Sequence, residues 1–294
     1  MAFVVLNFYV RHSLFIYMTS NQNVAVVTGS SSGIGHEISL ILARNGFRTY
    51  ATMRDLQKNS RLKSIKDEEN LSLEFVQLDV TDENSVSIAI KTIYDNAGRI
   101  DILVNNAGYG LTGAFEDLCI DEIKTQFETN FYGLIRTTQA VLPFMRKQKS
   151  GIIVNISSGA GRFGYPMGSA YVSTKFAVEG LSESLSYEVE PFGIRVILIE
   201  PGMIKTDFSN ASIMAKKSTD PNSPYMPLMK NMEKGIKRLH ENASSPQLVA
   251  NITYDAIISD EPKMRYLAGK DVEQWVEAKK KMSDEEFHNM IKQI

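Results

Sequence analysis

Short apolar runs alternate with longer amphipathic segments over most of this chain. Residues 24–28 form a β-branched apolar run, and residues 33–45 follow with apolar side chains at helical spacing. The same alternation recurs as far as residue 200. It predicts strands at 24–28, 47–53, 73–80, 102–105, 151–157 and 195–200, and helices at 33–45, from 81 onward, at 120–147 and at 170–190.

Strands and helices in this order predict an α/β fold with one Rossmann-type, doubly wound parallel sheet and helices on both of its faces. Continuous apolar strands need cover on two sides, which the crossover helices of a parallel sheet supply. We expect a single domain over residues 23–270. After the sixth strand, at 203–245, three prolines and five methionines break the alternation, and this segment is expected to be a substrate lid. A last strand at 264–268 and a charged helical tail at 271–294 complete the prediction.

Residues 1–22 precede the predicted domain and fit neither a membrane-spanning helix nor a secretory signal. Their two apolar runs are separated by Arg11 and His12, and neither approaches the ~20 residues that span a bilayer. A secretory signal would carry its positive charge before the apolar stretch. We expect an extension that is disordered or lies outside a native start at Met18, with an anchor on a membrane surface as the alternative.

The charge balance and the scarcity of cysteine and histidine exclude several classes of protein. Lysine and arginine number 32 against 34 aspartates and glutamates, a net charge of -2, so no basic field attracts nucleic acid or anionic lipid. The single cysteine, Cys119, excludes an intrachain disulfide framework and a zinc site built on thiolates. The four histidines are too scattered to ligate a metal. We expect no metal, no nucleic-acid or membrane partner, and a cytoplasmic location.

A glycine-rich turn joins the first predicted strand to the first predicted helix. Residues 28–35 read Thr-Gly-Ser-Ser-Ser-Gly-Ile-Gly, with the glycines spaced G-x-x-x-G-x-G. Glycines let the backbone approach an anion, and a helix N-terminus offers its N–H groups to a pyrophosphate. Two other interpretations stay open: a tight turn of small residues, and the G-x-S-x-G elbow of a serine hydrolase with Ser31 as nucleophile. The hydrolase also needs an acid and then a histidine, for which only His240 or His288 remains.

A tyrosine and a lysine four residues apart lie at the start of the helix predicted at 170–190. Side chains at i and i+4 share a helix face, so Lys175 can lie beneath the Tyr171 hydroxyl. A free phenol has a pKa near ~10, and a nearby ammonium favours the phenolate and lowers that value. Ser158 ends the fifth predicted strand, at the edge where a parallel sheet presents ligands, and could hold a carbonyl oxygen against the phenol. Together these residues predict an acid–base site.

These motifs resemble those of the short-chain dehydrogenase/reductase family and, locally, of its steroid- and retinol-dehydrogenase-like members. The resemblance covers about residues 23–269 and rests on six ordered motifs: Thr28-Gly29-x-x-x-Gly33-x-Gly35, Asn105-Asn106-Ala107-Gly108, Asn130, Ser158, Tyr171-x-x-x-Lys175 and Pro201-Gly202. It implies that Tyr171 is the general acid in reduction and the base in oxidation, and that Lys175 lowers its pKa and grips the nicotinamide ribose. It also implies that Ser158 polarises the substrate carbonyl and that Asn130 anchors a water in a proton relay behind Lys175.

The resemblance implies a nicotinamide dinucleotide cofactor, whose adenine amine would donate a hydrogen bond to Asp79. NAD-dependent members usually carry an acid at the end of the second strand, where this chain has Arg54, whose guanidinium suits a 2′-phosphate. We therefore expect NADP(H), with NAD(H) as the alternative because Asp55 is adjacent. The expected cofactor-binding residues are Gly29, Ser31, Ser32, Gly33, Ile34, Gly35, Arg54, Asp79, Val80, Asn106, Ala107, Gly108, Tyr171, Lys175, Pro201, Gly202, Ile204 and Thr206.

The residues expected around Tyr171 predict an apolar substrate pocket. Residues 159–168 line one approach to it, and Met203, Phe208 and Met214 line the other if the lid closes over the crevice. We expect hydride transfer between the cofactor and a ketone or secondary alcohol on a hydrophobic body. A non-catalytic dinucleotide-binding scaffold or sensor on the same fold is the alternative. The resemblance implies a homodimer or homotetramer that pairs through the helices at 120–147 and 170–190.

Overall fold

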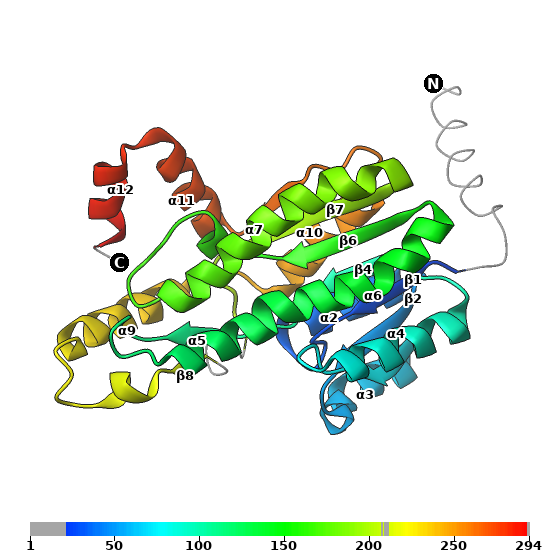
Figure 1. The fold of residues 1–294 in the computed structure, drawn as a ribbon, viewed down its shortest axis with the longest axis horizontal. Helices are drawn as coiled ribbons and strands as arrows, with labels where there is room; N and C mark the ends of the chain where they lie inside the picture. The colour runs from blue at the N-terminus through cyan, green and yellow to red at the C-terminus, as the bar shows by residue number, and fades with distance from the viewer. Residues whose placement is uncertain (1–21, 207, 209–211, 293–294) are drawn as a thin grey trace.

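The computed structural model describes residues 22–206, 208 and 212–292 (Figure 1). Apart from Gln22, the extension expected at 1–22 lies outside the described residues. The centre is a parallel sheet of seven strands in the order β3-β2-β1-β4-β6-β7-β9. Its strands are β1 (Val24–Val27), β2 (Arg48–Met53), β3 (Leu73–Gln77), β4 (Ile102–Asn105), β6 (Gly151–Ile156), β7 (Ile194–Pro201) and β9 (Arg265–Ala268). The strand order reverses between β1 and β4, where open α/β sheets bind their ligands.

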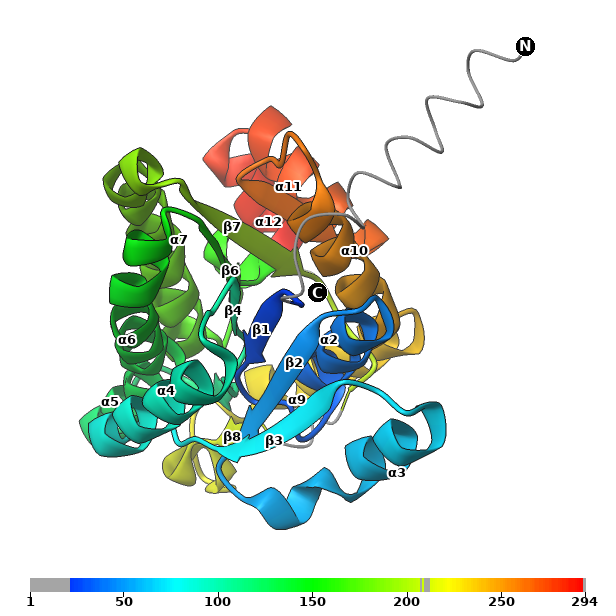
Figure 2. The same cartoon turned by 90° about the vertical axis from the view of Figure 1, so that its right-hand side faces the viewer.

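Helices cover both faces of this sheet (Figure 2). One face packs against α4 (Glu83–Ala97), α6 (Gly133–Gln148) and α7 (Ser169–Val189), and the other against α2 (Gly33–Arg44) and α10 (Pro246–Ile258). The predicted doubly wound α/β fold is therefore confirmed. The remaining elements are η1 (Leu56–Asn59), α3 (Ser60–Glu69), β5 (Leu111–Thr112), α5 (Ile120–Phe127), η2 (Glu128–Tyr132), η3 (Gly159–Gly161), η4 (Glu190–Phe192), β8 (Ile213–Met214), η5 (Lys216–Thr219), α9 (Met226–Glu241), α11 (Lys270–Lys281) and α12 (Asp284–Ile291).

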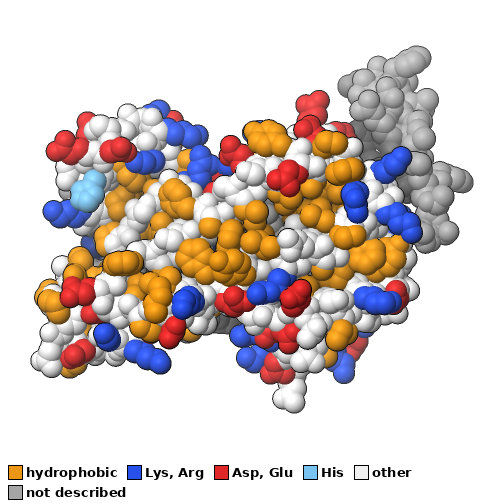
Figure 3. Space-filling view, viewed as in Figure 1, with side chains coloured by type: hydrophobic (Ala, Val, Ile, Leu, Met, Phe, Trp, Pro, Cys, Tyr) orange, Lys and Arg blue, Asp and Glu red, His pale blue; other side chains and the backbone are white. Residues whose placement is uncertain are grey.

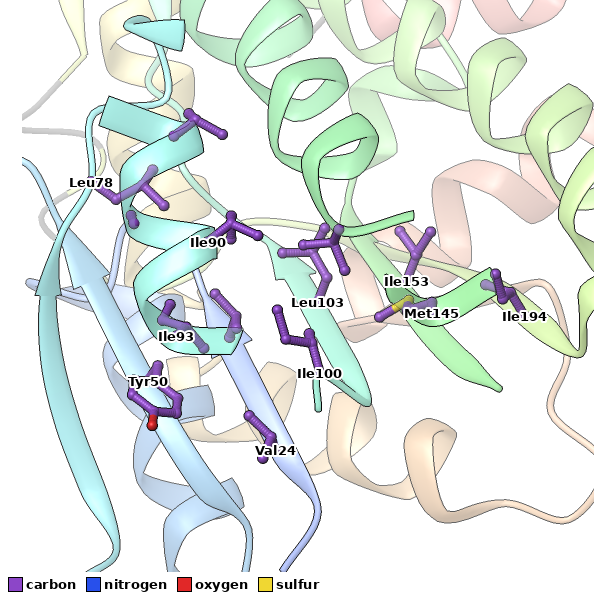
Figure 4. Packing of buried hydrophobic residues seen from close by; sticks show 14 of the residues in the cluster. Val24, Tyr50, Leu78, Ile90, Ile93, Ile100, Leu103, Met145, Ile153 and Ile194 are labelled. Atoms are coloured by element: carbon purple, nitrogen blue, oxygen red, sulfur yellow. The ribbon is translucent and has the colours of Figure 1, made fainter. Parts of the chain in front are cut away.

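Alternate residues of β1 enter the two layers of the core. Val24 and Val26 pack into the cluster that contains Ile90 of α4 and Met145 of α6 (Figure 4). Ala25 and Val27 belong to the cluster on the opposite face, with side chains of α2 and α10. All four residues of β1 are buried, which explains why the strand is a continuous apolar run rather than an alternating one.

The structure interrupts two of the predicted helices and adds elements that the pattern did not indicate. The helix expected at 120–147 consists of α5, the π-helical turn η2 and α6. The tail expected at 271–294 is two helices, because the Ser283 side chain caps the start of α12 by accepting from Glu286 N. The added elements include α3, α10 and the pair β5–β8. In α10 apolar residues occupy most positions, because the helix packs against both α2 and the sheet, so no helical stripe stands out.

The segment expected to be a lid is docked onto the loop that follows β5. Its strand β8 pairs with β5 in parallel, with Leu111 opposite Ile213. Further along, Met229 of α9 packs against Ala114 and Met167. The segment thus lies at the end of the molecule where the strands finish, close to the start of α7 (Figure 1).

The C-terminal helices α11 and α12 form a buried cluster with the loop after β6. Phe163 of that loop packs edge-on against Trp275 and Phe287, with ring centroids 5.7 and 5.6 Å away. Asp271, in the first turn of α11, accepts a hydrogen bond from Met203 N at 2.7 Å. These helices therefore fix two loops that border the ligand crevice. Within the described part of the chain, no helix is both long and apolar enough to cross a membrane.

Candidate active site

The first turns of α7 carry Tyr171 and Lys175 on the side that faces the end of β6. The Lys175 side chain is buried, and its Nζ donates to the carbonyl oxygen of Ile156, the last residue of β6, at 2.8 Å. The same Nζ lies 5.7 Å from the centroid of the Tyr171 ring. A strand end and a helix start thus hold the phenol and the ammonium together at the carboxyl edge of the sheet.

Ser158 follows β6 and lies between this pair and the end of β7. Its hydroxyl accepts from Ala160 N at 3.1 Å, which caps η3, and donates to the carbonyl oxygen of Pro201 at 3.5 Å. The extended backbone of Ser158 and the short η3 therefore set the direction of the hydroxyl. The structure brings Ser158 and Tyr171 together although they are thirteen positions apart in the sequence.

Asn130 lies in the π-helical turn η2 and connects the loop after β4 to α7. Its Oδ1 accepts from Tyr109 N at 3.1 Å, and its Nδ2 donates to Tyr109 O at 2.9 Å and to Thr174 Oγ1 at 3.4 Å. Thr174 is the neighbour of Lys175. Single π-helical turns inside α-helices frequently mark functional sites. Here the turn places the buried side-chain amide of Asn130 between the loop after β4 and α7.

Burial governs the protonation of the two titratable groups. It raises the pKa of Tyr171 to about 12, an effect that the nearby Ser158 hydroxyl partly offsets. Burial likewise lowers the pKa of Lys175 to about 8, against the opposing charge of Glu179. The sequence-based expectation that Lys175 lowers the pKa of Tyr171 is therefore wrong for this structure. The ammonium donates to the Ile156 carbonyl oxygen, and loss of solvation by the phenolate outweighs the hydrogen bond from Ser158.

The glycine turn is locked against the loop after β4. Asn106 Nδ2 donates to the carbonyl oxygens of Thr28 and Gly29, at 2.9 and 3.1 Å, and a Cβ on Gly35 would collide with that amide. Gly29 has φ +68°, which disfavours any other residue. Ser32, at the N-cap of α2, makes no side-chain cap, and the first turn of α2 carries no acid. The backbone N–H groups of this first turn therefore suit a pyrophosphate.

A polar cavity of about 640 Å³ opens beside this turn. Six of its lining residues were not among the expected cofactor-binding residues, namely His36, Glu37, Arg61, Lys205, His240 and Pro246. Nothing in the charged segment of α3 distinguishes Arg61 from its neighbours, so only the fold could find it. Arg54 does not line the cavity. It lies near Tyr109, whose pKa its charge lowers while burial raises it. The full lining is Ser31, Ser32, Gly33, His36, Glu37, Arg61, Lys205, Thr206, His240 and Pro246.

Comparison with known proteins identifies the family to which these features belong. The family model of short chain dehydrogenases matches residues 23–217. The chain belongs to this family. It is 38% identical over 246 residues to the oxidoreductase BOA17 of Botryotinia fuckeliana, covering 83% of this chain and 88% of that protein. It is 35% identical over 263 residues to retinol dehydrogenase 8 of Bos taurus, covering 84% and 82%.

Solved structures of short-chain dehydrogenases share the architecture. One from Streptomyces avermitilis superposes with a TM-score of 0.81 at 31% identity, covering 92% of this chain and 97% of that one. A serine dehydrogenase complexed with NADP+ superposes with a TM-score of 0.70 at 28% identity, covering 83% and 93%. This short-chain dehydrogenase is therefore an oxidoreductase on a Rossmann fold, which excludes the serine hydrolase interpretation of Ser31.

The other expected cofactor residues of this short-chain dehydrogenase lie along the same edge. Asp79 accepts from Thr81 N and Thr81 Oγ1, at 2.9 and 2.7 Å, and so shapes the turn after β3, which Val80 continues. Gly108 lies against the Asn130 side chain, Gly202 against Asp271, and Gly33 against Thr206. The remaining expected residues stand beside these, as Ala107 in the loop after β4, Ile34 in the first turn of α2, Pro201 at the end of β7 and Ile204 opposite Ser244.

Of the residues expected on the substrate side, Phe208 contacts Tyr171 and Met214 is exposed to solvent. The Phe208 ring lies edge-on to the Tyr171 ring, with centroids 5.9 Å apart. Met214 of β8 is exposed, whereas Met203 is held by its bond to Asp271. No cluster of histidine, cysteine, aspartate and glutamate in the described ranges could hold a metal ion.

Proposed function

We propose that this short-chain dehydrogenase transfers hydride between NADP(H) and a carbonyl or secondary alcohol on an apolar substrate, with Tyr171 as general acid and base. The observation that carries the proposal is the placement of Tyr171, Lys175 and Ser158 at one sheet edge, beside a glycine turn whose helix N-terminus suits phosphate. A retinol dehydrogenase among the relatives agrees with an apolar alcohol or carbonyl.

The chain offers groups that could hold each part of the cofactor. When it is bound, the cofactor would donate or accept the hydride. The amides at the start of α2 would hold the pyrophosphate, and Asp79 would accept from the adenine amine. Lys175 would grip the ribose hydroxyls next to the nicotinamide. Arg61, which lines the cavity, and Arg54, which follows β2, would supply cations for a 2′-phosphate.

The proton chemistry follows from the state of Tyr171. Because burial raises its pKa to about 12, the phenol is protonated at neutral pH and can donate to a carbonyl oxygen during reduction. Ser158 would hold that oxygen in reach of the phenol. In the oxidation direction the same oxygen must release its proton, so a raised pKa favours reduction. Asn130 would support proton resupply from the side of Lys175 and Thr174.

Replacing Tyr171 by Phe tests the acid directly. Tyr171→Phe should lower kcat by about 10²–10⁴-fold, the usual contribution of a general acid, because the ring stays and only the proton donor leaves. Turnover is followed by loss of absorbance of reduced cofactor across a panel of apolar ketones and aldehydes, and cofactor binding by quenching of protein fluorescence. Tyr187→Phe, at an exposed position of the same helix, is the matched control and should keep turnover. Retained turnover in Tyr171→Phe would identify a different acid.

Exchanging the charge at Arg54 tests the preference for NADP(H). Arg54→Asp should shift the ratio of kcat/KM for NADPH over NADH toward NADH by at least tenfold, because a carboxylate repels a 2′-phosphate and accepts from a 2′-hydroxyl. Lys58→Asp in η1 makes the same charge change nearby and should leave the ratio almost unchanged. Equal selectivity in Arg54→Asp and the wild type would refute the assignment.

We further propose a homodimer or homotetramer in the cytoplasm. Cys119 is exposed and free, which suits a reducing compartment. Exposed aromatic side chains on η2 and α7, among them Tyr132, Phe176 and Tyr187, support pairing through these helices.

A further inference from the structure

The ammonium of Lys175 is buried without a carboxylate in direct contact. Its Nζ donates to the Ile156 carbonyl oxygen, and it forms no ion pair within the described ranges. A buried ammonium with neutral neighbours tends to lose its proton. The proposed grip on the ribose needs the charged form, so some negative charge must reach Lys175 from farther away.

Glu179 lies one turn beyond Lys175 on the same buried side of α7. The residue is 7% exposed, and its Oε2 accepts from Arg265 Nε of β9 at 2.9 Å. Gly161 makes room for it, because a Cβ there would lie 2.8 Å from Glu179 Cγ and 3.2 Å from the Lys175 carbonyl oxygen. The carboxylate is thus packed behind the lysine rather than in solvent.

A second acid, Glu200 of β7, is fully buried beside the first. Its Oε1 accepts from Arg162 Nη1 at 2.9 Å and lies 3.6 Å from Arg265 Nε. One oxygen of each acid, Glu179 Oε1 and Glu200 Oε2, is buried without a hydrogen-bond partner. Burial and the charge of Glu179 both raise the pKa of Glu200. The ionised form of Glu200 is therefore disfavoured, whereas Glu179 is paired with Arg265 at 2.9 Å.

We infer that Glu179 is the buried counter-charge of Lys175, a positioning residue that keeps the ammonium protonated from behind while Arg265 holds it in place. This inference rests on the proposed role of Lys175. The charged and titratable groups that the described elements bring to this cluster are Tyr171, Lys175, Glu179 and Glu183 of α7, Arg162 after η3, Glu200 of β7 and Arg265 of β9.

Glu179→Gln tests the inference, because glutamine has the same shape without the charge. Without the carboxylate the charged lysine is less favourable, so the Lys175 titration should move about one unit to lower pH from its midpoint near pH 8. The midpoint is read from the 13Cε resonance of Lys175 in protein labelled with [13C]lysine, assigned by its absence in Lys175→Arg. This readout needs neither cofactor nor turnover, so it fails or succeeds separately from the proposed reaction.

Two variants of the same helix serve as controls. Glu183→Gln removes an exposed carboxylate that also binds Arg265, with Glu183 Oε2 2.6 Å from Arg265 Nη2, and should leave the midpoint unchanged. Glu179→Asp keeps the charge and should stay near the wild type. In addition, the pH above which the affinity for NADPH falls should move downward in Glu179→Gln alone. A purely structural role would instead change affinity equally at every pH.

The outcomes separate the two acids. A wild-type midpoint in folded Glu179→Gln overturns the inference. Glu200→Gln removes a carboxylate that is paired with Arg162 and should keep the wild-type midpoint, whether or not Glu179→Gln folds. A downward shift in Glu200→Gln would assign the counter-charge to Glu200 and overturn the assignment to Glu179.

Discussion

At the scale of single residues, the buried ammonium of Lys175 opposes folding. Its pKa falls from 10.5 to about 8, and each unit corresponds to roughly 1.4 kcal/mol between the folded and unfolded states. Because the folded pKa is the lower one, the penalty is complete below pH 8 and disappears as pH rises toward 10.5. Lys175→Met should therefore be more stable than the wild type at pH 7, by up to about 3 kcal/mol, while losing activity.

The pH trend is the part of this prediction that is independent of other effects of the substitution. Methionine also leaves the Ile156 carbonyl oxygen without its donor, which subtracts a constant amount at every pH. Urea unfolding of both proteins at pH 7 and pH 10 measures the difference in free energy of unfolding. That difference should shift by about 2–3 kcal/mol in favour of the wild type between the two pH values. A constant difference would show that burial does not lower the pKa of Lys175 in the folded protein.

Residues within one motif could be identified from the sequence, and residues joined by the fold could not. Tyr171 and Lys175 are four positions apart on one helix, so their meeting is a local property of helical geometry. Glu179 belongs to the same helix, but its environment depends on Arg265, which lies 86 positions away on the strand β9. The direction of the Tyr171 shift was missed for the same reason, because burial is a property of the assembled site.

At the scale of secondary-structure elements, the boundaries followed local chemistry and the exceptions followed tertiary contacts. The strand β1 and the helix α2 begin close to where the apolar pattern places them. The sequence gives no signal for the π-helical turn η2. The position of Asn130 in this turn depends on its hydrogen bonds to the backbone of Tyr109, which is distant in the sequence. The pair β5–β8 is short, and its strands are far apart in the chain, so no periodicity could indicate it.

One buried carboxylate binds the segment 203–245, which the sequence predicts to be a substrate lid, and this contact makes the predicted lid testable. Asp117 is 8% exposed, and its Oδ2 accepts from Ser218 Oγ at 3.2 Å and from Ser223 Oγ at 2.9 Å. Asp117→Ala removes both bonds, so α9 should exchange its amide hydrogens faster, and KM for an apolar carbonyl substrate should rise about 5–30-fold. The affinity for NADPH should not change, because Asp117 and its two serine partners lie away from the glycine turn.

Hydrogen exchange by mass spectrometry and steady-state kinetics measure the two effects on the lid. Asp121→Ala removes an exposed carboxylate from the neighbouring α5 and is the control. If the amide hydrogens of α9 exchange in Asp117→Ala as in the wild type, the apolar contacts of Met229 hold this segment without the hydrogen bonds of Asp117.

At the scale of the whole molecule, an apolar surface extends over the helices of one face. Figure 3 shows hydrophobic side chains gathered over α5, α6 and α7 on the viewed side. On α7, Phe176 is 47% exposed and Tyr187 is 70% exposed. They are eleven positions apart, close to three helical turns, so they lie on one stripe. Gly180 lies between them with open space beside it, so a second helix could approach the backbone closely.

This stripe is expected to be the contact between subunits, because large exposed apolar patches on soluble proteins usually mark interfaces. The double substitution Phe176→Glu with Tyr187→Glu should give a monomer by light scattering, since desolvating two carboxylates against an apolar partner is strongly unfavourable. Both side chains point away from the core, so circular dichroism and NADPH affinity should be retained. Ile88→Glu on α4 introduces a charge at another exposed apolar position, 67% exposed, and should keep the wild-type mass. If the double variant also keeps that mass, the subunits pair through a different face, and the stripe on α7 must serve another contact.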